Sequence, residues 1–128
     1  AAEVLGYAAE ALVLAGDWPR AVRQVDEALQ LATRLHDHAY LTQLLLLKRR
    51  IALARGARQD ADDATRQALL EARRQRSPWL EMTVLVDVCE AAHAGPDDIE
   101  ALRSVVAGLR EGSDAPLLQR AHAVLDRT

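Results

Sequence analysis

The chain has 128 residues, of which 50% are hydrophobic, and its 16 Lys and Arg against 19 Asp and Glu give a formal net charge of −3. Alanine and leucine dominate the apolar half, whereas phenylalanine is absent and only two Trp and two Tyr occur. Strands favour β-branched and aromatic residues, so this composition nearly excludes a β-rich fold and predicts an all-α one. The slight negative charge also argues against direct contact with nucleic acid, which requires a basic surface.

The sequence carries no sign of a membrane-bound or exported protein. Its longest apolar run, Leu44–Leu47, is far shorter than the ~20 residues that a membrane-spanning helix needs, and no signal peptide is visible. A single cysteine, Cys89, cannot form an internal disulfide, so a cytoplasmic location is expected. Because the chain begins at Ala1 and its only methionine is Met82, we expect it to be a piece of a longer protein.

Start signals divide the chain into helices. Asp17 is suited to act as an N-cap, and a proline follows it in the first helical turn. Ser77 with Pro78, then Pro96 and Pro116, mark later helix starts by the same reasoning. We expect about seven helices, over residues 2–15, 18–36, 38–55, 59–76, 78–94, 97–111 and 115–127.

This pattern recurs with a period of 40 residues. A shift of 40 places the small residues of the second helix on those of the fourth, and a second shift reaches residues 101–109, with Gly95 one residue out of register. In each copy a glycine follows a long apolar helix, and we expect it to close that helix in the left-handed conformation. The matched positions are Gly16, Ala21, Ala28, Leu29 and Ala32, then Gly56, Ala61, Ala68, Leu69 and Ala72, then Ala101, Gly108 and Leu109.

The two helices of a copy differ in where their apolar residues lie. Residues 18–36 are apolar on one side, whereas residues 38–55 are apolar on several sides. A helix of the second kind must lie between neighbours, as the inner helices of a repeat array do. We therefore expect a single domain, residues 1–128, built as an α-solenoid of about three helix-turn-helix repeats. The repeats span residues 2–36, 38–76 and 78–111.

The last helix, over residues 115–127, is predicted to be a cap. Five apolar residues share one of its faces, and polar residues occupy the other. Such a helix would cover the open end of a repeat array, as terminal repeats must for solubility. The apolar face consists of Leu117, Leu118, Ala121, Val124 and Leu125.

The first copy resembles a tetratricopeptide repeat (TPR). Residues 14–21 contain that family's turn, in which a glycine, an acidic residue and an aromatic residue precede a small residue. Ala9 and Ala28 match two further small positions of the family, whereas Arg49 and Val88 replace the first of these in the later copies. The resemblance implies a concave surface, lined by the first helix of each repeat, that binds a peptide or a partner helix.

The longer, 40-residue repeat also resembles the helical-repeat regions of large bacterial ATP-dependent transcription activators, such as the maltose regulator.

The TPR resemblance further implies which residues face the groove, with the three helix-end glycines as anchors. Leu46 and Leu53 lie off the apolar stripes that the core needs, so they either form an exposed patch or are covered by another helix. The implied groove residues are Glu10, Val13, Gln43, Leu46, Arg50, Leu53, Met82, Leu85, Cys89 and His93.

The sequence offers little for catalysis or metal binding. The six glycines are scattered and form no phosphate-binding loop. His36 and His38 point in nearly opposite directions if both are helical, so we interpret them as part of a helix junction. Cys89 and His93 are one turn apart among apolar residues, which favours a buried structural thiol over a catalytic pair. We expect no enzyme activity, no metal site and no cofactor.

The sequence thus predicts a non-catalytic scaffold that presents a groove to a peptide or a partner helix. Self-association and binding of a small effector in the same groove are further possibilities. The alternative is an effector-sensing or oligomerisation segment of a modular bacterial transcription regulator. Neither interpretation includes direct contact with nucleic acid or a membrane.

Overall fold

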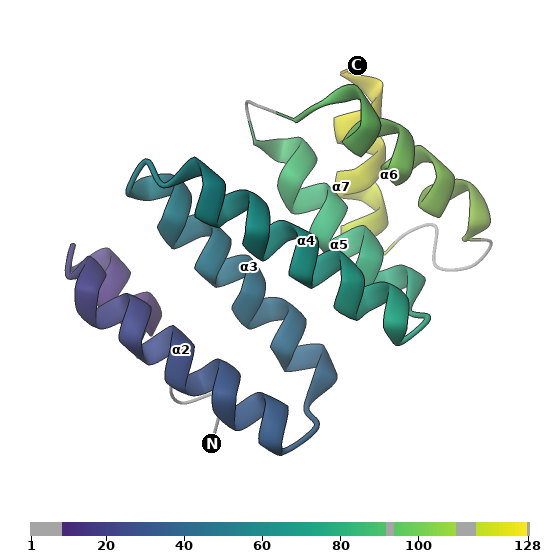
Figure 1. Ribbon diagram of the computed structural model, residues 1–128. Helices are drawn as coiled ribbons and strands as arrows, with labels where there is room; N and C mark the ends of the chain where they lie inside the picture. The colour runs from purple at the N-terminus through teal and green to yellow at the C-terminus, as the bar shows by residue number, and fades with distance from the viewer. Residues whose placement is uncertain (1–8, 92–93, 110–114, 128) are drawn as a thin grey trace. The chain divides into compact units, whose positions relative to one another are not determined.

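The computed structural model describes residues 9–91, 94–109 and 115–127 (Figure 1). All regular secondary structure within these ranges is α-helical, which confirms the predicted all-α fold. Residues 9–14 belong to a first helix, and each later helix begins within one residue of its predicted start. These later helices are α2 (Trp18–Arg34), α3 (His38–Ala54), α4 (Arg58–Arg74), α5 (Pro78–Glu90), α6 (Pro96–Gly108) and α7 (Pro116–Asp126).

Four turns of one type, spaced 20 residues apart, separate the helices up to α5. Gly16, His36, Gly56 and Arg76 each follow a helix with a positive φ, between 53° and 78°. In every case the N–H of that residue donates to the carbonyl three positions earlier, and the next N–H donates to the carbonyl five positions earlier, at 2.8–3.2 Å. These bonds satisfy carbonyls that a helix end leaves unpaired. Each later turn therefore needs only three residues between successive helices.

The predicted left-handed helix end is confirmed for both glycines of these turns and is wrong for Gly95. Gly95 has φ −85° and is the N-cap of α6, where its N–H donates to Oδ2 of Asp98 at 3.2 Å. The reason is that α5 already ends at Glu90, four residues before its predicted end, so Gly95 falls in the connection. His36 and Arg76 show that this turn forms without glycine as well.

Side chains cap the helices that follow three of the turns. Asp17, Asp37 and Ser77 each accept a hydrogen bond from the backbone N–H three positions later, at 3.2–3.4 Å. Each bond satisfies one of the N–H groups that a helix start leaves without a partner. The two caps predicted from sequence, Asp17 and Ser77, are confirmed. Asp37 makes the segment around His36 and His38 a helix junction, as expected.

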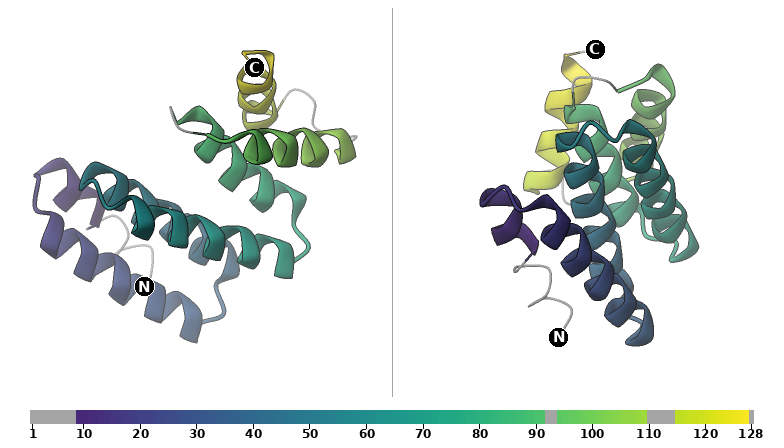
Figure 2. Two further views of the ribbon diagram at one scale, coloured as in Figure 1. Left: turned by 45° about the horizontal axis from the view of Figure 1, so that its top comes forward. Right: turned by 60° about the vertical axis from the view of Figure 1, so that its left-hand side comes forward.

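The contacts divide the chain into two compact units, unit 1 (Ala1–Glu71) and unit 2 (Ala72–Thr128). In unit 1, α2 and α3 run side by side as an antiparallel pair (Figures 1 and 2). α2 buries a single face, whereas α3 is buried on several sides, as the apolar patterns predict. The buried residues of α2 are Ala21, Val25, Ala28 and Ala32, and the buried apolar residues of α3 are Leu44, Leu45, Leu46, Leu47, Ile51 and Ala52.

Alanines occupy the matched positions of the first two copies of the repeat. Ala21 and Ala28 of α2 and Ala61 and Ala68 of α4 are all 0–1% exposed. Side chains this small let neighbouring helices approach closely. In the third copy Ala101 is half-buried, and the residue after it is the one that α6 buries. The one-residue register difference rotates the buried face of a helix by about 100°, which accounts for this departure.

Unit 2 is built around α5, which contacts both α6 and α7 (Figure 2). α7 buries Leu118, Ala121 and Val124 and exposes its polar face, so the predicted amphipathic pattern is confirmed. On the polar side, Arg120 donates two hydrogen bonds to the carboxylate of Glu90 in α5. The solenoid arrangement of the whole chain stays a prediction.

Candidate functional site

The implied groove residues of unit 1 differ in exposure. Leu53 is 36% exposed, whereas Leu46, two turns earlier on α3, is only 4% exposed. The sequence pattern assigns the two leucines the same role, but their environments differ. Leu46 is packed inside the unit, whereas the side chain of Leu53 is accessible to a partner. Of the other implied residues of this unit, Glu10, Gln43 and Arg50 are exposed and Val13 is half-buried.

The implied groove residues of unit 2 lie on the buried sides of α5. Met82 and Leu85 are 0% exposed, and Cys89 is 8% exposed. Side chains buried to this extent contribute to packing and offer almost no surface to a partner. His93 lies outside the described residues, so its pairing with Cys89 stays a prediction.

Unit 1 contains a pocket that none of the implied groove residues lines. It has a volume of about 390 Å³ and lies where the first halves of α2 and α4 meet the second half of α3. Its apolar lining comes from all three helices, and its charged residues include both signs. The lining residues are Val22, Val25, Asp26, Lys48, Ile51, Ala52, Arg55, Asp60, Asp63, Ala64 and Gln67.

The pocket and the exposed groove residues lie on opposite faces of α3. The helix contributes Lys48, Ile51 and Ala52 to the pocket, and its C-cap residue Arg55 is the fourth lining residue. At 100° per residue, their mean direction around the helix axis differs by about 180° from that of Gln43, Arg50 and Leu53. Unit 1 therefore has two separate surfaces on which another molecule could bind.

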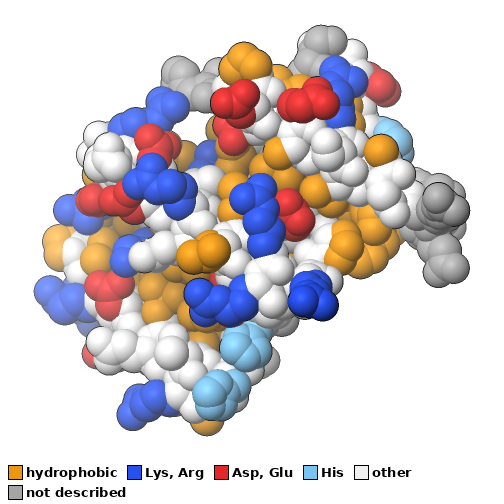
Figure 3. Space-filling model, turned by 45° about the vertical axis from the view of Figure 1, so that its right-hand side comes forward, with side chains coloured by type: hydrophobic (Ala, Val, Ile, Leu, Met, Phe, Trp, Pro, Cys, Tyr) orange, Lys and Arg blue, Asp and Glu red, His pale blue; other side chains and the backbone are white. Residues whose placement is uncertain are grey.

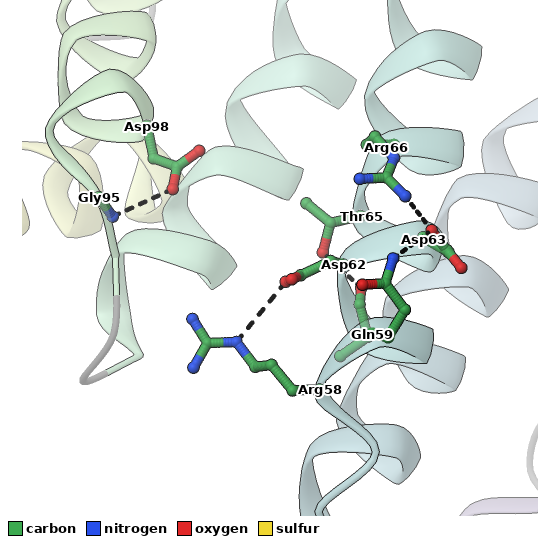
Figure 4. A network of polar contacts seen from close by, with 9 residues as sticks. Arg58, Gln59, Asp62, Asp63, Thr65, Arg66, Gly95 and Asp98 are labelled. Atoms are coloured by element: carbon green, nitrogen blue, oxygen red, sulfur yellow. Dashed lines mark hydrogen bonds and ion pairs between the residues drawn. The ribbon is translucent and has the colours of Figure 1, made fainter.

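Most charged groups at the pocket are already paired. Nζ of Lys48 lies 3.5 Å from Oδ1 of Asp26, which links α3 to α2. Asp63 accepts hydrogen bonds from Gln59, at 3.2 Å, and from Arg66 (Figure 4). These pairs are at least one-third exposed and therefore add little to stability.

Two charged groups of the pocket, Arg55 and Asp60, have no ion-pair or hydrogen-bond partner for their side chains among the described residues. Arg55 caps the end of α3, and Asp60 lies in the first turn of α4. The negative charge of Asp60 is favourable there because helix N-termini are partly positive. By contrast, the nearby pair Arg58–Asp62 lies outside the pocket lining, with Nε 3.7 Å from Oδ1 (Figure 4).

The histidines of the α2–α3 junction belong to a structural contact. Nδ1 of His38 lies 3.0 Å from Oε1 of Glu71, which joins the start of α3 to α4. The ring of His36 lies 6.1 Å from that of His38, measured between centroids. Among the described residues, no group of three or more His, Cys, Asp or Glu side chains is placed to hold a metal ion.

Cys89 is a buried thiol, as its apolar neighbours in the sequence predict. Burial, and to a smaller extent the negative charge of Asp98, raise the pKa of the Cys89 thiol above its ordinary value. Both effects disfavour the thiolate, which is the nucleophilic form. The environment of Cys89 is thus the opposite of the one that activates a catalytic cysteine.

We expect Cys89 to react with a thiol reagent such as DTNB several-fold more slowly in the native chain than in urea at pH 8. Since the native state holds the thiol proton more tightly, this group stabilises the fold below the ordinary thiol pKa of about 8.5. That contribution is lost as the pH rises through the raised native pKa. As the pH rises above the ordinary thiol pKa, the urea midpoint of the wild type should therefore fall more steeply with pH than the urea midpoint of Cys89→Ala. Equal slopes and native labelling as fast as in urea would contradict this assignment.

Among the described residues, charges of both signs are mixed on the face of the molecule that Figure 3 shows. On the face drawn in Figure 3, Lys and Arg side chains alternate with Asp and Glu, and hydrophobic side chains lie between them. Such a mixed surface differs from the continuous basic stripe with which proteins track a phosphate backbone. In the part of the chain that the structure describes, no helix has the length and apolar character needed to cross a membrane.

The chain matches no family model, no curated protein and no solved structure.

Proposed function

We propose that this chain is a non-catalytic scaffold that binds a peptide or a partner helix through unit 1. The observation that carries the proposal is that Gln43, Arg50 and Leu53 are exposed on one side of α3, a helix that is otherwise largely buried. A leucine with polar neighbours on a fixed helix is the kind of surface that a partner's apolar side chain can use. On the helix before α2, Glu10 is exposed, whereas Val13 is half-buried and packs against the core that α2 and α3 share.

The geometry of unit 1 supports this function because it holds the line of side chains in place. α2, α3 and α4 each have 17 residues, and turns of only three residues join them. Hydrogen-bonded turns of this length leave little freedom at the helix ends. A receptor that is ordered before binding loses less conformational entropy when the partner arrives.

The test is a selection of helical peptides from a displayed library against the full chain. Peptides that bind the proposed surface should lose about tenfold or more in affinity with Leu53→Glu and with Arg50→Glu, because each change introduces a repelled or desolvated charge. Leu70→Glu is the matched control, since Leu70 is 58% exposed but lies on α4. Peptides that respond to Leu70→Glu and ignore the α3 variants would refute the proposal, as would the absence of any binder.

Light scattering over a range of concentrations tests whether the occupant of this surface is a second copy of the chain. In that case the wild type should dimerise, and Leu53→Glu should return it to a monomer. A dimer that survives this change would place the self-association elsewhere.

The second candidate is an effector-sensing or oligomerisation segment of a modular bacterial transcription regulator, with TPR-like repeats like those of the maltose regulator. The pocket between α2, α3 and α4 favours this candidate, because a small effector needs a concave site. A nucleotide-binding loop upstream and a helix-turn-helix downstream in the full gene would support it. A short reading frame that encodes this chain alone would favour the scaffold.

A further inference from the structure

The pocket of unit 1 combines an apolar floor with charges of both signs at one end. Its volume of about 390 Å³ is at the lower end of the range, about 300–1,000 Å³, in which small-molecule sites fall. Aliphatic and methyl groups from three helices form the floor. Contact with them would remove several sides of a ligand's apolar body from water at once. The floor residues are Val22, Val25, Ile51, Ala52 and Ala64.

The two charged groups that have no partner among the described residues, Arg55 and Asp60, lie at the same end of this floor. Arg55 follows the last turn of α3, and Asp60 comes in the first turn of α4, so only the short connection separates them in the chain. The other carboxylates of the lining, Asp26 and Asp63, are already paired with cations. Within the part of the chain that the structure describes, the guanidinium of Arg55 and the carboxylate of Asp60 therefore remain for a ligand.

We propose that this pocket binds a small zwitterion with an aliphatic body, of the class of a free aliphatic α-amino acid. The guanidinium of Arg55 would receive the ligand carboxylate, for which its forked donors are well suited. The carboxylate of Asp60 would accept hydrogen bonds from the ligand ammonium group. The aliphatic side chain would then cover the floor formed by α2, α3 and α4.

This inference goes beyond the proposed scaffold function, because it concerns the opposite face of α3. A ligand on this face leaves Gln43, Arg50 and Leu53 accessible, so the pocket and the partner surface can be filled together. Loss of one activity therefore does not imply loss of the other, and the experiments below give separate answers.

The test follows backbone amide resonances of the full chain by NMR during titration with three related probes. L-Leucine carries both charges, 4-methylpentanoate lacks the ammonium group, and 3-methylbutylamine lacks the carboxylate. L-Leucine should bind most tightly and shift the amides of the pocket-lining residues. Equal binding of the three probes, shifts confined to other residues, or no shift up to the solubility limit of leucine would overturn the proposal.

Charge-removing variants identify the role of each group. Asp60→Asn should weaken leucine binding about tenfold and should not weaken binding of 4-methylpentanoate, which the carboxylate of Asp60 repels. Arg55→Gln should weaken leucine binding similarly and should not weaken binding of 3-methylbutylamine. Asp62→Asn and Arg58→Gln are matched controls, because this neighbouring pair lies outside the pocket. If the control variants reduce the affinity for leucine as much as the pocket variants do, the loss reflects the overall charge of the region, and the assignment fails.

Discussion

Replacement of Leu46 by aspartate is expected to destabilise the chain strongly and to abolish most of its helical signal at moderate urea concentrations. Leu46 is 4% exposed, so the substitution places a carboxylate where water hardly reaches and removes a buried aliphatic side chain. Burying an unpaired charge is among the few changes that cost more than about 4 kcal/mol. That is a large part of the roughly 5–15 kcal/mol by which a domain is stable.

Two controls separate burial from other effects in this experiment. Leu46→Met keeps the volume and should cost less than about 1.5 kcal/mol. Leu53→Asp introduces the same charge on the same helix, but at a side chain that is 36% exposed, so its cost should be much smaller. Circular dichroism at 222 nm with urea gives the three midpoints. A wild-type midpoint for Leu46→Asp would mean that Leu46 faces solvent and belongs to the partner surface.

The contrast between these leucines shows what the sequence could not provide. Both lie on the same side of α3, seven residues apart, and helical periodicity assigns them the same role. Their exposure differs because neighbouring groups cover that side at one level of the helix and leave it open at another. Which neighbour reaches which level is a matter of tertiary packing, and no local pattern records it.

The helix starts were predictable because their signals are local. Asp17 and Ser77 accept hydrogen bonds from N–H groups only three residues away, so the sequence around each start contains both partners. Helix ends at glycine were predictable for the same reason. His36 and Arg76 take the left-handed conformation although their side chains disfavour it, and the bonds from their own helices hold them there. A rule based on glycine alone misses them.

The pocket of unit 1 was not predicted from the sequence, because no local pattern of its lining residues indicates a pocket. The apolar periodicity of α2 and α3 includes Val22, Val25 and Ile51, and Arg55 and Asp60 are polar residues near helix ends. A pocket arises only where the spacing of α2, α3 and α4 leaves some of this apolar surface uncovered. Small residues at Ala52 and Ala64 contribute to that space, and their effect depends on three helices together.

Deletion of residues 113–128 is expected to expose an apolar face of unit 2 and to cause dimerisation or aggregation. α7 contacts both α5 and α6, and its buried residues are Leu118, Ala121 and Val124. Without α7, the apolar side chains that these residues cover would face water, and contact with another copy would be favoured. Size-exclusion chromatography with light scattering measures the result. An unchanged monomer with full solubility would show that α7 does not cap the fold.

Point variants show whether the apolar face of α7 or its ion pair holds the helix in place. Leu118→Ala should lower the free energy of unfolding by about 2–5 kcal/mol, since Leu118 is 3% exposed. His122→Ala on the exposed face should change it by less than about 0.5 kcal/mol. Arg120→Ala removes the pair with Glu90, whose side chains are 52% and 36% exposed, and should cost no more than about 1 kcal/mol. A larger loss for Arg120→Ala than for Leu118→Ala would mean that the pair anchors α7. The opposite order would identify hydrophobic burial as the force that closes this end of unit 2, and a truncated chain would then recover that burial by self-association.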